Sequence, residues 1–243
     1  MKMTKENNKK LPISIMVLAL LMVTLSMVSG EPAGTAITFN QTDPGLTIQP
    51  DNRTDPGGTI TTLVLDALQQ TNRWKAYVGN ITGSLTLSDS TGSTIFSWTL
   101  EQSGITGEIY SSRSNNVAWG DIRCADTTVI DDEESFLGLT GSEAYSITET
   151  FNETIHEGLT IGPALIGSDT CFSTSTYVND NPQPQASADF QLILLDDTID
   201  LVYTTPISAE TTGYDGSLFD FQLIVPNNPQ DTTTYYFYAQ IGG

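Results

Sequence analysis

The chain has 243 residues, enough for one ample hydrophobic core or two small ones, and its 29 acidic and nine basic residues give a formal net charge of −20. This charge disfavours nucleic-acid partners and anionic lipid surfaces, because both require a basic footprint on the protein. From Cys124 to Gly243 there are nineteen Asp or Glu residues and no Lys or Arg. Those carboxylates must be solvated, bind cations or meet a basic partner.

The N-terminus predicts export. Four lysines precede an uncharged run from Leu11 to Val28, which ends in small residues. This pattern is typical of a signal peptide over residues 1–30, cleaved after Gly30 to leave Glu31 first. The alternative is an uncleaved membrane anchor, since the run is just long enough to span a bilayer. Membrane attachment is expected only through this segment.

Residues 31–60 are rich in Pro and Gly and predict an extended leader. Within it, Ile37 to Phe39 has the composition of one strand, belonging either to this chain's own domain or to a neighbour's. Leu63 to Gln70 fits both a strand and a helical face, and we favour the strand.

The next segment carries the clearest alternation of apolar and polar residues. Trp74 to Val78, Ile81 to Ser88 and Ile95 to Leu100 predict three strands, joined by turns at Gly79-Asn80 and at Asp89 to Gly92. We therefore expect a three-stranded meander with half-buried strands. Trp98 would share a buried face with Phe96 and Leu100.

Further elements are shorter. Gly107 to Ser111 and Val117 to Ile122 predict strands. The acidic run Asp131 to Glu134 predicts the start of a short helix that extends through Leu137, with its anions near the positive end of the helix dipole. Phe151 to Leu159 has helical spacing, but its threonines favour extended structure.

The last third predicts four strands: Phe190 to Leu195, Leu201 to Thr205, Phe219 to Val225 and Thr233 to Ile241. The sequence DFQLI occurs at residues 189–193 and again at 220–224, as expected of two core strands with the same alternation. Together the pattern predicts an all-β chain, with a single β-sandwich over residues 61–243, immunoglobulin-like or jelly-roll-like, behind the extended leader.

Cys124 and Cys171 predict a disulfide in an exported chain, since His156 is the only histidine available to complete a two-cysteine metal site. Such a bridge would contribute about 4 kcal/mol by restricting the unfolded chain. Two buried free thiols are the alternative.

No residue pattern specifies a reaction. His156 lies in no nucleophile-elbow or zinc-helix motif, so we expect a polar surface or capping role for it. Paired carboxylates could serve a secreted glycoside hydrolase, but the acids are too numerous to single out a pair. We therefore assign no catalytic residue and no certain cofactor.

Calcium is the ion that these carboxylates are best suited to bind, because hard cations bind carboxylate and backbone oxygens in loops. The candidate ligands fall in three clusters, none of which matches an EF-hand loop. They are Asp131, Asp132, Glu133 and Glu134; Asp196, Asp197 and Asp200; and the turn Asn179 to Asn181. Solvated acidic loops are the alternative.

Two surface roles are also considered. Trp74, Trp98 and Trp119 could form a platform for sugars, although core packing is the expected role of such residues in strands. Four sequons predict N-glycosylation, at Asn40, Asn52, Asn80 and Asn152.

Several segments carry a resemblance: Trp74 to Gly83, Thr176 to Asn179 after Cys171, Phe219 to Pro226 and Thr233 to Tyr238. In these segments the chain resembles a group of exported, mostly uncharacterised archaeal proteins of the cell surface. The resemblance implies a secreted, β-rich surface protein, and it carries over no catalytic residue.

We therefore expect a structural or adhesive component of an archaeal cell surface, such as a filament or envelope subunit. Its partners would be copies of itself, other surface proteins or glycans. Ile37 to Phe39 could assemble it by adding a strand to the sheet of the next subunit. The alternatives are a secreted binding module for glycans or a surface partner, and a secreted hydrolase.

Overall fold

The computed structural model describes residues 30–242 except 46–48, 66 and 101–103. The predicted signal peptide therefore lies outside the described residues, apart from Gly30. None of the helices in the described part of the chain is long and apolar enough to cross a bilayer. The described chain is mostly β, with a large antiparallel sheet, as the predicted class requires, while the β-sandwich stays a prediction.

The strands are β1 (Ala33–Gly34), β2 (Trp74–Gly79), β3 (Ser84–Ser88), β4 (Thr94–Thr99), β5 (Thr106–Ser112), β6 (Arg123–Cys124), β7 (Leu159–Ile161), β8 (Ala164–Ile166), β9 (Ser173–Ser175), β10 (Gln191–Asp196), β11 (Leu201–Pro206), β12 (Thr211–Thr212), β13 (Leu218–Phe219), β14 (Phe221–Pro226) and β15 (Tyr236–Gly242). The helices are α2 (Thr127–Leu137), α3 (Ile147–Thr150) and two 3-10 turns, η2 (Trp119–Asp121) and η3 (Gln185–Ser187).

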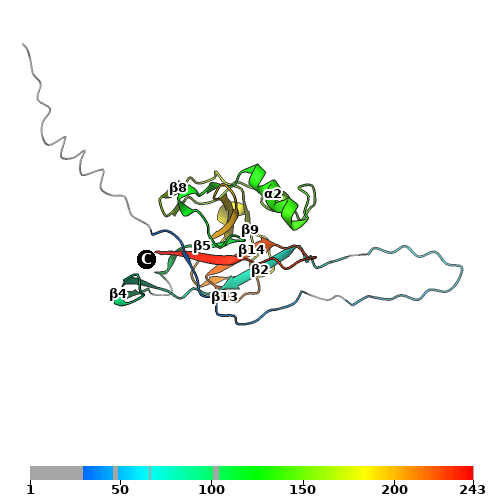
Figure 1. Cartoon of the computed structure of the whole chain (residues 1–243). Helices are drawn as coiled ribbons and strands as arrows, with labels where there is room; N and C mark the ends of the chain where they lie inside the picture. The colour runs from blue at the N-terminus through cyan, green and yellow to red at the C-terminus, as the bar shows by residue number, and fades with distance from the viewer. Residues whose placement is uncertain (1–29, 46–48, 66, 101–103, 243) are drawn as a thin grey trace, which may run out of the picture.

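Seven of the described strands form one antiparallel sheet, the main sheet, in the order β1-β15-β5-β11-β10-β6, with β9 also paired to β10 (Figure 1). β5 forms the longest pairings of this sheet. Its residues Thr106 to Ser112 pair with Gly242 to Tyr236 of β15, and Glu108 to Ser112 pair with Pro206 to Val202 of β11. At Gly107 the φ angle is +118°, and a side chain there would collide with the carbonyl of Gln240. Glycine therefore permits the close approach of β15.

The first face of the main sheet is covered by α2, α3 and the β2–β14 pair. Leu192, Leu194 and Tyr203 point to this face and are fully buried. They pack with Leu223 and Val225 of β14 and with apolar residues of α2 and α3. Because β-sheets are stabilised by burying a face in this way, these contacts form the largest core of the fold.

The second face is covered by η2 and the β7–β8 hairpin. Ile193 and Val202 point to this face. Three aromatic rings also lie there, with Trp119 centred between Tyr110 at 5.1 Å and Tyr238 at 5.2 Å. Such edge-on arrangements are the preferred geometry of buried aromatic pairs. Alternate residues of one strand thus serve two cores, so β10 is apolar from Leu192 to Leu195 and β11 from Leu201 to Tyr203.

Most predicted strands are confirmed, with small shifts at their ends. The strand at residues 74–78, the hairpin of β3 and β4, the strand at 107–111 and the four C-terminal strands are all present. The repeated sequence falls on β10 and β14, where Leu192 and Leu223 occupy equivalent positions and meet in one core. The match therefore reflects two strands that face the same interior.

Three strand or pairing predictions between residues 63 and 122 are wrong. β2 pairs with β14, more than 140 residues later, and not with β3, so there is no three-stranded meander. Val117 to Ile122 forms the turn η2, because Trp119 inserts into the second core instead of alternating along a strand. The described residues of Leu63 to Gln70 form no strand and are exposed.

Helix α2 is confirmed but begins earlier than expected. Asp126 caps it by accepting the backbone N–H of Thr128 at 2.9 Å, and Gly138 ends it at φ 66°. The acidic run therefore lies in the middle of the helix and not at its N-terminus. Residues 151–158 are mostly irregular, after the short helix α3, with strand structure only from Leu159.

The leader meets the main sheet at one point. Ala33 and Gly34 pair with Ala239 and Tyr238 of β15. Ile37 and Phe39, which were expected to form a strand, lie outside any described strand and are about 70 % exposed. Beyond them the chain extends as a long loop that leaves the folded body and returns at β2 (Figure 1).

The predicted disulfide is confirmed, with the Cα atoms of Cys124 and Cys171 4.8 Å apart. Cys124 ends β6 and Cys171 lies two residues before β9, so the bridge joins the two segments that share the outer edge of β10.

We expect replacement of both cysteines by alanine to lower the free energy of unfolding by about 4 kcal/mol, because the bridge closes a loop with a sequence separation of 47 residues. Urea denaturation of the double variant measures the loss. A loss below about 1 kcal/mol would show that the unfolded chain gains little freedom when the bridge is absent.

Candidate functional site

The four acids of α2 divide between two environments. Asp131 and Asp132 are exposed, whereas Glu133 and Glu134 are buried. Glu134 accepts the backbone N–H of Thr148 at 2.9 Å and so connects α2 to α3. The helical period thus separates these acids, which were expected to act together, into a solvated pair and a buried pair.

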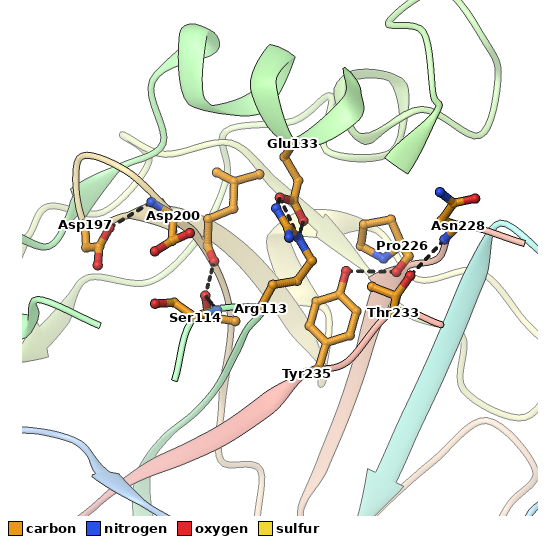
Figure 2. Close-up of polar contacts among 11 residues, drawn as sticks. Arg113, Ser114, Glu133, Asp197, Asp200, Pro226, Asn228, Thr233 and Tyr235 are labelled. Atoms are coloured by element: carbon orange, nitrogen blue, oxygen red, sulfur yellow. Dashed lines mark hydrogen bonds and ion pairs between the residues drawn. The ribbon is translucent and has the colours of Figure 1, made fainter. Parts of the chain in front are cut away.

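Glu133 forms an ion pair with Arg113, which directly follows β5 (Figure 2). The guanidinium donates from Nε to both carboxylate oxygens, at 2.8 and 2.9 Å, and from Nη2 to Oε2. The ring of Phe136 lies 3.7 Å from the centre of the guanidinium. One arginine thus fixes α2 over the edge of the first core.

Two tyrosines surround this pair on the first face. The hydroxyl of Tyr235 donates to the carbonyl of Pro226 at 2.8 Å. Tyr203 is fully buried, and no partner for its hydroxyl is found among the described residues. Burial, followed by the negative charge of Glu133, raises the pKa of both phenols. These hydroxyls therefore stay protonated and neutral at physiological pH.

The carboxylates of Asp196 and Asp197 are occupied by hydrogen bonds within the fold. Asp196 is fully buried and accepts the Arg123 guanidinium at 2.8 Å and the backbone N–H of Asp126 at 2.6 Å. Asp197 accepts the backbone N–H groups of Ala118 and Asp200, at 2.9 and 2.8 Å. Both carboxylates act as acceptors for loops that would otherwise leave N–H groups unpaired.

The structure brings together no calcium ligands from the predicted clusters. Asp200 is half-buried beside Asp197, and the turn at Asn179 to Asn181 is exposed. Within the described ranges, no three His, Cys, Asp or Glu side chains lie close enough to hold a metal ion. Calcium binding stays a prediction without an identified site.

His156 is buried and its ring is held by backbone groups on both sides. Nε2 accepts the N–H groups of Thr170 and Cys171 at 3.1 and 2.9 Å. Nδ1 donates to the carbonyl of Glu157 at 2.6 Å. Both ring nitrogens are thus occupied, and His156 orders the chain beside the disulfide, not on the surface as one expectation had it.

Two small hollows on the described part of the chain adjoin α2. A shallow depression of about 230 Å³ is lined by Arg113, Phe136, Thr232 to Thr234 and Tyr236. A second, of about 120 Å³, lies between α2 and α3 and is mainly apolar. The charged group in the first, Arg113, is already paired with Glu133, and the second is lined by a single carboxylate, Asp131, so neither hollow brings together a set of reactive groups.

The strongest surface feature is the hairpin of β3 and β4. Leu85 lies opposite Trp98, and Leu87 lies opposite Phe96. These four side chains, which we call the apolar hairpin face, are 43–56 % exposed. The rings of Phe96 and Trp98 are 4.9 Å apart. Because strand residues alternate, Thr86 and Ser97 point to the opposite side.

The hairpin was expected to be half-buried, and that expectation is wrong. Its base is anchored, since Ile81, Leu100 and Ile105 pack with Ile109 in a third small core. Beyond this base the strands leave the body, and β3 and β4 pair only with each other. Trp98 is therefore a surface residue, whereas Trp119 is core and Trp74 is half-buried, donating to the carbonyl of Tyr145 at 2.7 Å.

The four predicted glycosylation sites, Asn40, Asn52, Asn80 and Asn152, are all exposed. Exposure is required for modification but does not demonstrate it, so their glycosylation stays a prediction.

We expect Arg113→Ala to lower the free energy of unfolding by about 3 kcal/mol, since it leaves the buried Glu133 carboxylate unpaired. The double variant Arg113→Met/Glu133→Leu should lose less than the single variant, because it buries no charge. Urea denaturation at pH 7 tests both. An equal or larger loss in the double variant would contradict this account of the pair.

Glu108 gives a pH-dependent prediction. Burial against the second core raises the pKa of its carboxyl to about 7, although the hydroxyl of Tyr110 donates to it at 3.2 Å. The folded state then binds the proton more tightly, so this contribution to stability is complete below pH 4.5 and disappears as pH rises through 7. From pH 4 to pH 8, the free energy of unfolding of the Glu108→Gln variant should rise by about 1–2 kcal/mol relative to that of wild type. This range allows for partial solvent exposure of the carboxyl. Denaturation at both pH values measures the gain.

Comparisons with protein-family models, with curated proteins and with solved structures find no match for this chain. Its role is therefore argued from its own residues.

Proposed function

We propose that this chain is an exported, non-enzymatic structural or adhesive protein of the archaeal cell surface, which assembles with copies of itself by strand addition. The archaeal surface location rests on the sequence resemblance and on the N-terminal export pattern. The disulfide is consistent with an oxidising extracellular environment. In this proposal residues 61–243 form a β-sandwich, and the preceding segment is its extended leader.

The apolar hairpin face carries the proposal. Isolated two-stranded hairpins are marginally stable in water and require a further strand or a packed face. Here four large apolar side chains are presented on such a hairpin, and among the described residues nothing covers them. Exposed apolar sheet surfaces of this kind are sites of association.

Charge supports the same conclusion. A chain with a net charge of −20 repels its own copies over most of its surface. From Ser84 to Thr99 the hairpin carries only one charged residue, Asp89, located in its turn. Two copies can therefore approach through this region without bringing many carboxylates together.

Glycan binding is a second candidate, favoured by the exposure of Trp98. Sugar sites combine an aromatic platform with hydrogen-bonding groups beside it. On this hairpin the hydroxyl side chains Thr86 and Ser97 lie on the face opposite the rings, which favours a protein partner over a sugar.

We expect the exported wild-type protein to form oligomers whose size increases with concentration. In the variant Phe96→Thr/Trp98→Thr, the dissociation constant of the oligomer should rise at least about tenfold. The variant removes two large apolar contact residues but retains residues that favour strands. Sedimentation velocity and electron microscopy measure this.

The matched control is Thr86→Ala/Ser97→Ala, a change to the opposite face of the same hairpin, which should assemble like wild type. A wild-type protein that stays monomeric at high concentration would refute the proposal. Binding of a glycan array that is lost in the Trp98 variant would establish the second candidate instead.

A further inference from the structure

A second apolar segment of the chain is also exposed to solvent. Ile60, Leu63, Val64 and Leu65 are 100, 56, 96 and 84 % exposed, and residues 59–65 lie in no described strand. The sequence Thr-Ile-Thr-Thr-Leu-Val-Leu over these residues has no charge, no Pro and no Gly. Such a composition has high strand propensity and is typical of segments that add to sheet edges. We call residues 59–65 the donor segment.

From these observations we infer that the donor segment of one copy adds as a third strand to the β3–β4 hairpin of a second copy. This inference deepens the proposed function and rests on it. Among the described strands β3 and β4 pair only with each other, so the outer edge of each is open to a further strand. A third strand would bond one of these edges, and its apolar residues would extend the apolar hairpin face.

The position of the two elements favours a second copy over the same chain. The loop that contains the donor segment projects from one end of the molecule, and the hairpin lies at the other end (Figure 1). Eight residues separate Leu65 from Trp74, and the distance between these two residues is at most about 30 Å. To reach its own hairpin, the segment would have to double back almost fully extended along β2, which is itself about 20 Å long.

Charge favours the same pairing. The donor segment has no charged residue and the hairpin has one, in a chain whose remaining length is strongly acidic. Donor and acceptor are thus the two stretches where contact between copies avoids carboxylate repulsion. Because the two elements are different and lie at opposite ends, the contact is heterologous. Repetition of such a contact produces open filaments or rings, not closed two-fold dimers.

The inference differs from the sequence-based expectation in the strand it uses. Ile37 to Phe39 was expected to be exchanged, but that stretch lies only two residues beyond β1, which is paired to β15 of its own chain. Residues 59–65 lie in the loop between β1 and β2 and belong to no described strand. They can therefore leave the body without breaking a described strand pair.

A complementation experiment tests this. One full-length chain carries Leu63→Asp/Leu65→Asp, which disables the donor, and another carries Phe96→Thr/Trp98→Thr, which disables the acceptor. Each exported variant alone should be monomeric, with its dissociation constant raised at least about tenfold. An equimolar mixture should form dimers, since it contains one intact donor and one intact acceptor. Sedimentation velocity measures all three samples.

The control Gln49→Asp/Gln69→Asp adds the same charge to the same loop outside the donor segment, and it should assemble like wild type. Circular dichroism and an intact disulfide confirm that each variant is folded. If the mixture stays monomeric, or if the donor variant assembles like wild type while the acceptor variant does not, the donor assignment is wrong but the proposed function stands. A monomeric wild type would refute both.

Discussion

The ion pair between Arg113 and Glu133 is the interaction on which the first core depends. It links α2 to Arg113 at the end of β5, and Tyr235, which directly precedes β15, lies beside it (Figure 2). Tyr203 belongs to the same core. A buried carboxylate is costly unless it is paired and hydrogen-bonded, and here three donor contacts from one guanidinium satisfy it. The pair specifies the position of α2, because few other arrangements of the helix would place a cation beside Glu133.

The other cations act in the same manner. Arg123 reaches Asp196, Lys75 donates to the carbonyl of Thr233, and Arg73 donates to the carbonyl of Gly138 at the C-terminal end of α2. Four of the five positive residues after residue 30 thus contact the half of the sequence that has none. Two of these four contacts are ion pairs and two are hydrogen bonds to backbone carbonyls, so most of the nineteen carboxylates from Cys124 to Gly243 are not neutralised by these cations and oppose the approach of other copies. What remains for association are the uncharged stretches.

Prediction from sequence succeeded where the signal was local. β10, β11 and β14 were identified because each contains a short apolar run between turn residues, and the disulfide because only two cysteines exist. Pairing was not predictable, since β2 finds its partner β14 across most of the chain and no local pattern encodes that choice. The apolar hairpin face was missed for a related reason. Alternation at Leu85, Leu87, Phe96 and Trp98 shows that two faces differ, but it does not show that either one is covered. The near absence of charge in that hairpin was the available signal.

The order of elements along the chain has a mechanical consequence. The donor loop enters β2 at Trp74, and β3 of the acceptor hairpin begins at Ser84, soon after β2 ends. In a row of subunits joined through these two elements, tension would pass through the continuous backbone between residues 65 and 84. The main sheet, α2 and the disulfide lie outside this loaded segment and would bear little of the tension. Tensile strength and thermodynamic stability would then reside in different parts of the molecule, and each could vary without the other.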